Sequence, residues 1–376
     1  MVTIAPFRAV RPSKLFQEQI SISSPAIGSN ISQIHLNYNQ HRAQKRLIQD
    51  AEENLYIYKQ TKLHSAKSYT GMIANTSIDD YLNGTIKTHE KTLETREQFF
   101  RELFTVCNFS SEPVLVTHPD NEDIKSLINL YTAKQADFEY TENEISHQLW
   151  LVNNIEHVNT AKSAFLNCSN IYIADGHHRS ASSVFVGQNR RNQNVNQTGA
   201  ESFNYFMCLF MSFSELEVFS INRVVKDLNG KTTKEFLLEL QEDFYVDSSY
   251  TRQVTTSSFE MYLDGCWYHI ITKENVFNAT DPVKSLATHT LATRILSPLL
   301  SLNERAAGNR IEYVNGQEDK TLLEQKVDSG MAAVAFLLQP ITIRQIQSIA
   351  DADQTMPPKT TWVEPKIQNG LTFFEF

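Results

Sequence analysis

Five consecutive residues, Asp175-Gly176-His177-His178-Arg179, form the densest group of chemically active side chains in this sequence. They follow a short apolar run at 171–174 and precede small residues from Ser180 onward, an order typical of a strand, a turn and a helix. The first N–H groups of a helix are unpaired and lie at the positive end of its dipole, which favours a phosphate or carboxylate. We therefore expect an anion site here. The alternative is a polar turn with two solvated histidines.

The residue types in this turn suggest distinct roles. Gly176 lets the backbone approach an anion closely, and Arg179 can donate to two of its oxygens. With His177 and Ser180, these residues are the expected phosphate contacts. Asp175 and His178 are candidates for acid–base work; Asp175 could also hold Mg²⁺ or orient a histidine. Adjacent histidines without a third ligand at helical spacing give little support for zinc, so no metal-ligand set is predicted.

Two other polar segments carry comparable chemistry. Residues 87–92 supply two cations, Lys87 and Lys91, together with His89 and Glu90, just before an expected helix at 93–104 that Thr92 could cap. We expect the lysines to contact phosphate and His89 or Glu90 to transfer protons; the alternative is a solvated approach to the helix. Near the end of the chain, two prolines stiffen the backbone before Lys359, so we expect a docked segment with this lysine directed at an anion or serving structure alone.

Composition limits the classes of protein and partner. The chain has 376 residues, 41% hydrophobic and 20% charged, which is ordinary for a globular protein. A formal net charge of −9 without a long basic run disfavours nucleic acid as a partner and leaves a small-molecule ligand. No run approaches 18 apolar residues and no signal peptide is evident, so we expect no membrane partner and a cytoplasmic location. The four cysteines are widely spaced and are expected to be buried hydrophobes.

Apolar periodicity predicts strands and helices mixed along the whole chain. The clearest expected strands lie at 55–58, 69–74, 114–117, 149–152 and 203–211, and 259–271 is expected to form a hairpin. Helices are expected at 93–104, 121–130, 234–244 and 286–300, and a loop at 188–202. This predicts an α/β or α+β class, with mixed sheets and flanking helices. We expect an N-terminal region at 1–145 with the Lys87–Thr92 segment, and a C-terminal region at 146–376 with the turn.

The turn and several other segments together resemble a large microbial family, domain-of-unknown-function family ten-fifteen. The matching segments occur in the same order over most of the chain: Ala5-Pro6-Phe7-Arg8-Ala9-Val10, Ser77-Ile78-Asp79-Asp80-Tyr81, residues 86–92, Ile173-Ala174-Asp175-Gly176-His177-His178-Arg179, residues 222–228, Asn309-Arg310-Ile311 and residues 356–366. Many relatives have Tyr and Glu directly after the arginine, where this chain has Ser180 and Ala181. If that Glu were the general base, this chain would lack it.

The turn alone is also similar, over about fifteen residues, to the nucleotide-binding turn of the ParB/sulfiredoxin superfamily, which includes partition proteins and free-serine kinases. This resemblance implies a ParB/sulfiredoxin-like fold around the turn and a nucleotide ligand, ATP, ADP or CTP, with Mg²⁺. It implies a phosphotransferase acting on a small hydroxyl metabolite such as free serine. Ala181 removes the carboxylate that relatives have at that position, which leaves Glu90 and Asp175 as candidate bases. Asp175 suits a metal or orienting role better, so Glu90 is the expected base. A nucleotide-binding sensor without catalysis and a metal-dependent hydrolase, which could draw ligands from His89 and Glu90, are the alternatives.

Overall fold

The computed structural model describes residues 1–14, 16, 25–194, 196–249, 257–302 and 308–376. These residues divide into two compact units. The first comprises residues 1–88, 92–217 and 365–376, and the second comprises 89–91 and 218–364. The predicted class of mixed strands and helices is confirmed. The region boundary expected at 145–146 falls inside a strand, Ile145–Val152, whereas the change of unit lies at 217–218.

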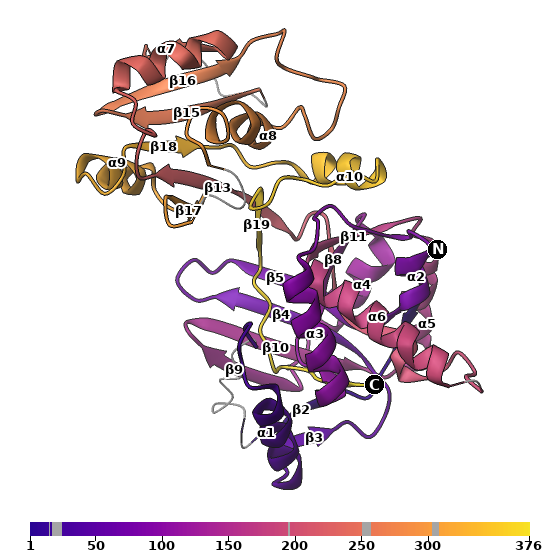
Figure 1. Ribbon diagram of the computed structural model, residues 1–376. Coiled ribbons are helices and arrows are strands. Elements are labelled where there is room, and N and C mark those ends of the chain that lie inside the picture. The colour runs from indigo at the N-terminus through magenta and orange to yellow at the C-terminus, as the bar shows by residue number, and fades with distance from the viewer. Residues whose placement is uncertain (15, 17–24, 195, 250–256, 303–307) are drawn as a thin grey trace. The chain divides into compact units, whose positions relative to one another are not determined.

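The elements of the first unit alternate between strands and helices (Figure 1). In chain order they are β1 (Ile4–Ala5), β2 (Val10–Pro12), α1 (Ile31–Ala43), β3 (Leu47–Gln49), β4 (Leu55–Lys62), β5 (Ser68–Ser77), α2 (Ile78–Leu82), β6 (Ile86–Lys87), α3 (Glu94–Cys107), β7 (Phe109–Ser110), β8 (Val114–His118), α4 (Glu122–Thr132), β9 (Phe138–Glu142), β10 (Ile145–Val152), α5 (Ile155–Leu166), β11 (Ile171–Asp175), α6 (His177–Gln193), a 3₁₀ helix (Ser202–Asn204), β12 (Tyr205–Ser212) and β20 (Phe374–Glu375).

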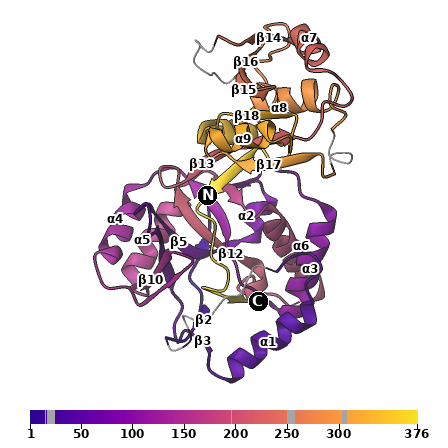
Figure 2. The same cartoon turned by 90° about the vertical axis from the view of Figure 1, so that its left-hand side faces the viewer.

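Among the described residues, a nine-stranded sheet organises this unit, in the order β6-β11-β8-β12-β5-β4-β10-β9 with β1 beside β5. Figure 2 shows α4 and α5 on one side of the sheet and α3 and α6 on the other. Alternate apolar residues of the strands, such as Val116 and Phe210, pack with Leu127 of α4 and Phe165 of α5 in one buried core. The nearly continuous apolar run that forms β12 is buried on both faces because β12 lies between β8 and β5.

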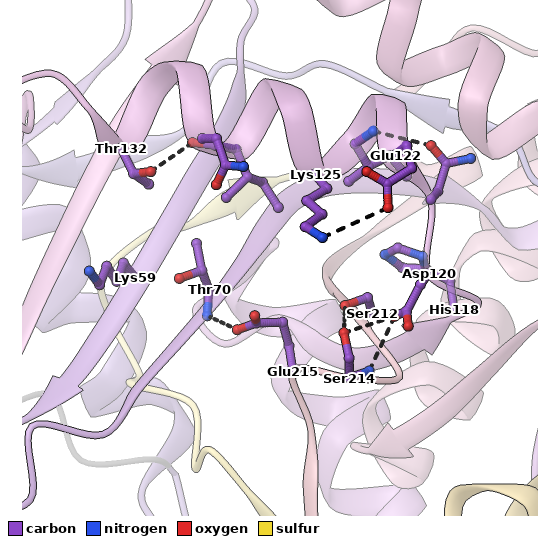
Figure 3. A pocket seen from close by; sticks show the side chains of 14 residues that line it. Lys59, Thr70, His118, Asp120, Glu122, Lys125, Thr132, Ser212, Ser214 and Glu215 are labelled. Carbon is purple, nitrogen blue, oxygen red and sulfur yellow. Dashed lines mark hydrogen bonds and ion pairs between the residues drawn. The ribbon is translucent and has the colours of Figure 1, made fainter.

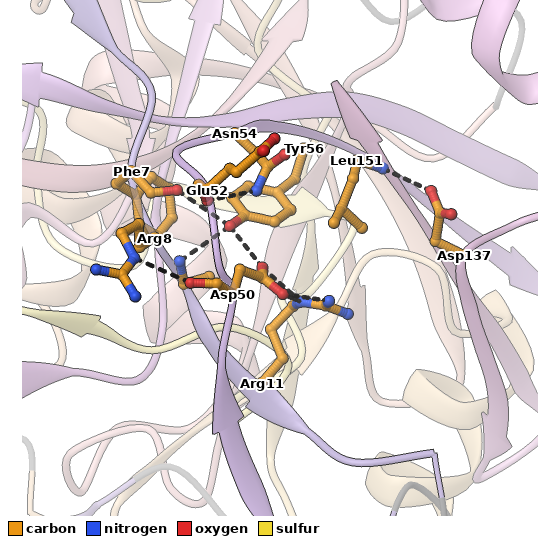
Figure 4. Close-up of polar contacts among 10 residues, drawn as sticks. Phe7, Arg8, Arg11, Asp50, Glu52, Asn54, Tyr56, Asp137 and Leu151 are labelled. Atoms are coloured by element: carbon orange, nitrogen blue, oxygen red, sulfur yellow. Dashed lines mark hydrogen bonds and ion pairs between the residues drawn. The ribbon is translucent and has the colours of Figure 1, made fainter. Parts of the chain in front are cut away.

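The N-terminal segment is attached to this sheet by a buried polar cluster (Figure 4). Arg11 donates to both carboxylate oxygens of Asp50, with Nε 2.8 Å from Oδ2, and the hydroxyl of Tyr56 donates to the same Oδ2 at 2.8 Å. Burial and the neighbouring Asp50 charge raise the pKa of Tyr56, so the phenol keeps its proton. Arg8 donates from Nε to the Asp50 carbonyl at 3.0 Å. The cluster therefore holds residues 7–11 against β4.

The second unit is built on a seven-stranded sheet, counted among the described residues, in the order β14-β16-β15-β18-β13-β17 with β19 beside β13. Its elements are β13 (Glu217–Val225), α7 (Thr233–Asp243), β14 (Phe244–Asp247), β15 (Ser258–Leu263), β16 (Cys266–Thr272), α8 (Ala287–Leu291), a π-helical turn (Ala292–Leu296), β17 (Ile311–Asn315), α9 (Lys320–Asp328), β18 (Val334–Leu337), α10 (Ile343–Asp351) and β19 (Thr361–Glu364).

Four local predictions are wrong. Of the cysteines expected to be buried, Cys107 and Cys208 are buried, whereas Cys168 is half-buried and Cys266 is exposed. The long helix expected at 286–300 is a short α8 followed by a π-helical turn, which ends two residues before Pro298. The loop expected at 188–202 begins only after α6 has continued to Gln193. Thr92 does not cap the following helix: Leu93 is the N-cap of α3, and the Thr92 hydroxyl donates to Glu97. No helix in the described part of the chain is long and apolar enough to cross a membrane.

Candidate functional site

The turn after β11 has the strand–turn–helix geometry that the sequence predicts. Gly176 is the N-cap of α6 and has φ of 100°, in the left-handed region that glycine adopts without strain. A Cβ at this position would lie 3.0 Å from Nη2 of Arg179, so the turn has no room for a side chain. Because glycine provides no capping side chain, and the first turn of α6 contains no acidic residue, the helix begins with its positive end uncompensated by a cap.

Arg179 points beneath the turn. It is buried, forms an ion pair with Glu112, and donates from Nη1 to the Pro113 carbonyl at 2.9 Å. Ser180 is fully buried, and its hydroxyl and N–H donate to the carbonyls of His177 and Gly176 at 3.0 and 2.9 Å. These two expected phosphate contacts therefore fix the shape of the turn. The buried His177 precedes both in sequence and is the first residue of α6.

The solvent side of the turn carries a second cation that sequence reasoning missed. Nζ of Lys366, in the segment 365–376, lies 3.2 Å from Oδ2 of Asp175, and both side chains are about half exposed. Burial alone would raise the pKa of Asp175, but the charges of Lys366 and Arg179 outweigh it and lower that pKa. Asp175 is therefore an anion at neutral pH, and it holds Lys366 beside the start of α6. The sequence signal for Lys366 was its place in the family segment 356–366, where nothing distinguishes it as a functional residue.

His178 joins the starts of two helices. Its Nε2 accepts a hydrogen bond from the backbone N–H of Leu93, the N-cap of α3, at 2.9 Å. Partial burial and the nearby charge of Arg96 lower the pKa of His178, so the ring is neutral at neutral pH. A neutral ring that accepts at Nε2 carries its proton on Nδ1. The start of α3 therefore lies at the turn, and α3 also has no side-chain cap.

The segment 87–92 is tied to the turn at both ends within the first unit. β6 pairs in parallel with β11, so that Lys87 lies opposite Tyr172, and Leu93 bonds to His178 as described. The three residues between, 89–91, belong to the second unit. Whether His89 and Glu90 share a pocket with His178 therefore stays a prediction. His89 is buried, whereas Glu90 and Lys91 are exposed.

The second unit brings together the other two predicted segments. Glu90 forms a parallel bridge with Met356, and the Met356 N–H donates to the His89 carbonyl at 2.9 Å. Three residues later, the exposed Lys359 has φ of 58°, and its carbonyl accepts from Nη2 of the buried Arg223 at 2.7 Å. The segment around Lys359 is therefore docked. Within the described residues, no group of three or more His, Cys, Asp and Glu side chains could hold a metal ion.

Residues 8–289 match the family model described as "Protein of unknown function (DUF1015)", and the chain belongs to this family. No curated protein matches the chain.

Several solved structures are similar in outline. A free serine kinase variant in complex with AMP has a TM-score of 0.41 and 13% identity over 80% of this chain and 92% of its own. SbnI with a C-terminal truncation from Staphylococcus aureus has a TM-score of 0.43 and 12% identity, covering 80% and 86%. A conserved hypothetical protein from Pyrococcus furiosus has a TM-score of 0.38 and 14% identity, covering 80% and 94%.

Proposed function

We propose that the chain binds a nucleotide at the start of α6 and transfers a phosphoryl group from it to a small hydroxyl metabolite such as free serine, in the cytoplasm. The observation that carries this proposal is the construction of the turn. An uncapped helix N-terminus follows a left-handed glycine, contains no acidic residue in its first turn, and lies beside a lysine. Backbone N–H groups and a nearby ammonium are the groups that bind phosphate oxygens in proteins.

Each residue of the turn has a role in this proposal. The backbone at 176–178 and Lys366 contact the phosphates, and Lys87 at the end of β6 adds a further cation near β11. Arg179 and Ser180 hold the turn rigid from below, since their donors are used inside the protein. Asp175 orients Lys366 and is the one carboxylate of the turn suited to Mg²⁺, which binds nucleotides through one or two carboxylates and the phosphate oxygens. Mg²⁺ would neutralise charge on the transferring phosphoryl group.

The catalytic part of the proposal rests on Glu90. An acceptor hydroxyl needs a carboxylate to take or orient its proton, and Asp175 is already engaged by Lys366. Glu90 is exposed, follows the end of β6 at Lys87 by three residues, and forms a bridge with Met356. Glu90 is flanked in sequence by His89 and Lys91, and Lys359 follows three residues after Met356, which bridges to Glu90. These three residues supply the remaining acid–base and cationic groups.

Nucleotide binding is tested first, by thermal shift and calorimetric titration with ATP, ADP and CTP, with and without Mg²⁺. Binding of at least one nucleotide is expected, and binding of none would contradict the proposal. Product formation from free serine and similar hydroxyl metabolites is then followed by mass spectrometry. Nucleotide binding without any phosphorylated product would favour a nucleotide-binding sensor over a kinase.

The Glu90→Gln variant tests the base. It keeps the shape of the side chain and removes the proton acceptor, so turnover should fall by about a hundredfold while nucleotide affinity stays nearly unchanged. Glu102→Gln, the same change at an exposed position of α3, is the matched control for the loss of a carboxylate charge. Full activity of Glu90→Gln would exclude Glu90 as the base.

A further inference from the structure

The first unit contains a second polar cavity, of about 310 Å³, between the sheet and α4 (Figure 3). Four polar residues that line it lie in one row across adjacent strands. Lys59 of β4 pairs with Thr70 of β5, and Ser212 of β12 pairs with His118 of β8. β12 pairs with β5 so that Phe210 lies opposite Met72. Because the strands are antiparallel, Ser212, two residues further along β12, lies next to Thr70. The cavity therefore extends along one edge of four strands.

This cavity is separate from the turn at α6. β8 runs antiparallel to β11, with Tyr172 opposite Thr117 and Asp175 opposite Leu115. Asp175 therefore lies toward the start of β8, where Arg179 bonds to Pro113, whereas His118 at the cavity is the last residue of β8. The two places lie at opposite ends of the same strand, so a ligand in the cavity is not a ligand of the phosphate site.

One end of the cavity is rich in hydrogen-bond acceptors. Asp120 accepts from the backbone N–H and the hydroxyl of Ser214 at 3.2 and 2.9 Å, and a carboxylate can accept about four hydrogen bonds in all. His118 is 1% exposed, and its Nδ1 bonds to the Pro119 carbonyl at 2.8 Å, which fixes the proton on Nδ1. Nε2 of His118 is then an acceptor that lines the same end of the cavity as the Asp120 carboxylate. A carboxylate with an imidazole acceptor close to it suits a ligand ammonium.

The other end carries a cation. Lys59 lines the cavity at the end away from His118 and Asp120 in Figure 3, and it forms no ion pair within the described part of the chain. The only other lysine in the lining of this cavity, Lys125, is at the exposed rim, 3.8 Å from Glu122. Lys59 is therefore the group available to a ligand carboxylate.

The distance between the ends selects the length of the ligand. Lys59 and His118 are three strand spacings apart, about 14 Å between backbones. The helix above this row contributes two apolar side chains to the lining, Ile124 and Ile128, one turn apart. Three carboxylates in the lining, those of Asp120, Glu122 and Glu215, disfavour a polyanion such as a nucleotide.

We propose that this cavity binds a small linear amino carboxylate whose ammonium and carboxylate groups are separated by several methylenes. The ammonium lies at Asp120 and His118, the carboxylate lies at Lys59, and the methylenes pack under Ile128. The volume is within the range of small-molecule sites. This site is independent of the proposed nucleotide site and does not depend on phosphoryl transfer.

The test is a calorimetric titration of the full chain with 6-aminohexanoate, compared with 1-aminohexane, which lacks the carboxylate, and hexanoate, which lacks the ammonium. The zwitterion should bind about tenfold or more tightly than either, because each lacks one charge-assisted contact. Equal binding of all three, or no binding of 6-aminohexanoate at millimolar concentration, would overturn the proposal.

Two variants locate the ends of the ligand. Lys59→Met removes a side chain without an ion-pair partner in the described residues, so the fold should be kept; it should weaken 6-aminohexanoate and leave 1-aminohexane unchanged. Asp120→Asn should weaken both amines and leave hexanoate unchanged. Lys162→Met, at an exposed position of α5, is the matched control and should change nothing. Loss of affinity in the control, or unchanged affinity in both test variants, would show that binding occurs elsewhere.

Discussion

Helices α4 and α6 each follow a strand of the same sheet, yet their N-termini are chemically opposite. α4 begins at Asn121, whose side chain accepts from the N–H groups of Asp123 and Ile124 at 3.0 and 3.1 Å, and its first turn carries Glu122 and Asp123. α6 begins at a glycine, has no capping side chain, and carries two histidines and an arginine. The positive end of α4 is satisfied by its own sequence, whereas that of α6 is left for a ligand.

The residue at the N-cap therefore determines whether the N–H groups at the start of a helix are satisfied by its own side chain or are open to other groups. The asparagine cap and the acidic first turn stabilise α4, which lines one side of the cavity. In the proposed complex, Asp120 and His118 at this end of the cavity bind the ligand ammonium. The glycine N-cap of α6 lacks that stabilisation, and under the proposed function the open terminus binds an anion, so something else must hold the turn in place. Arg179 beneath the turn supplies that support by pairing with Glu112.

The largest expected effect comes from removing this support. Arg179→Ala removes the ion pair with Glu112 and the hydrogen bond to the Pro113 carbonyl in a largely buried place, and should lower the free energy of unfolding by about 3 kcal/mol. Arg191→Ala is the matched control in the same helix, because its pair with Asp79 is far more exposed and should cost under about 1 kcal/mol. Urea denaturation of both variants checks the difference. Equal losses would mean that Arg179 does not anchor the turn.

Arg179→Ala should also weaken nucleotide binding, by roughly 1.5–3 kcal/mol, because it removes the support that holds the N–H groups of the turn in position for phosphate. Unchanged affinity in a calorimetric titration of the folded variant would exclude this part of the proposal.

A smaller effect is expected at the solvent side of the turn. Lys366→Met removes the half-exposed ammonium beside Asp175, so nucleotide affinity should fall about tenfold while the stability hardly changes. Calorimetric titration with the nucleotide that binds best measures the first, and thermal unfolding without ligand measures the second. A loss of stability without a loss of affinity would make Lys366 a structural residue only.

Removal of the N-cap of α4 should lower the stability and leave nucleotide affinity unchanged. Asn121→Ala leaves two N–H groups at the start of α4 without their acceptor and should cost about 1 kcal/mol of stability. Nucleotide affinity should not change, since α4 lies at the other end of β8 from the turn. Chemical denaturation and the same titration check both statements. A variant that lost nucleotide affinity would show that the two helix termini are not independent.

The turn itself could be predicted from the sequence because its signals are local. A short apolar run before Asp175-Gly176 predicts the strand, and the small residues from Ser180 onward predict a helix, which in the structure begins three residues earlier, at His177. The same holds for the hairpin at Asp264-Gly265 and for α7, whose apolar spacing is regular. Predictions went wrong where polar residues hid the helical pattern, as in the last turn of α6, and where a stretch with Thr293, Ile295 and Pro298 ended a regular helix after Leu291.

The partners of the turn could not be predicted because they are distant in the sequence. Arg179 was expected to contact phosphate, and nothing near it in the sequence shows that Glu112 and Pro113 lie beneath it. Lys366 is 191 residues from Asp175 and reaches it only because the segment after β19 rejoins the first unit. That return of the chain also explains why a single boundary at 145–146 does not describe the two units.

The smallest expected effect on stability comes from the titration of two histidines, His118 near the start of α4 and His178 at the start of α6. Burial lowers the pKa of both His118 and His178 below the ordinary value of 6.5. Because these histidines bind protons more tightly in the unfolded chain, protonation favours unfolding. The stability that the two neutral rings contribute is therefore lost as the pH falls from about 6.5 toward their lower pKa values in the folded protein. Both rings should carry their proton on Nδ1, since Nε2 of His178 accepts from Leu93 and Nδ1 of His118 donates to Pro119. Nitrogen-15 NMR of the imidazoles across this range reports tautomer and pKa together. The more deeply buried His118 should titrate at the lower pH, and either ring titrating above 6.5 would contradict the hydrogen bonding assigned to its helix terminus.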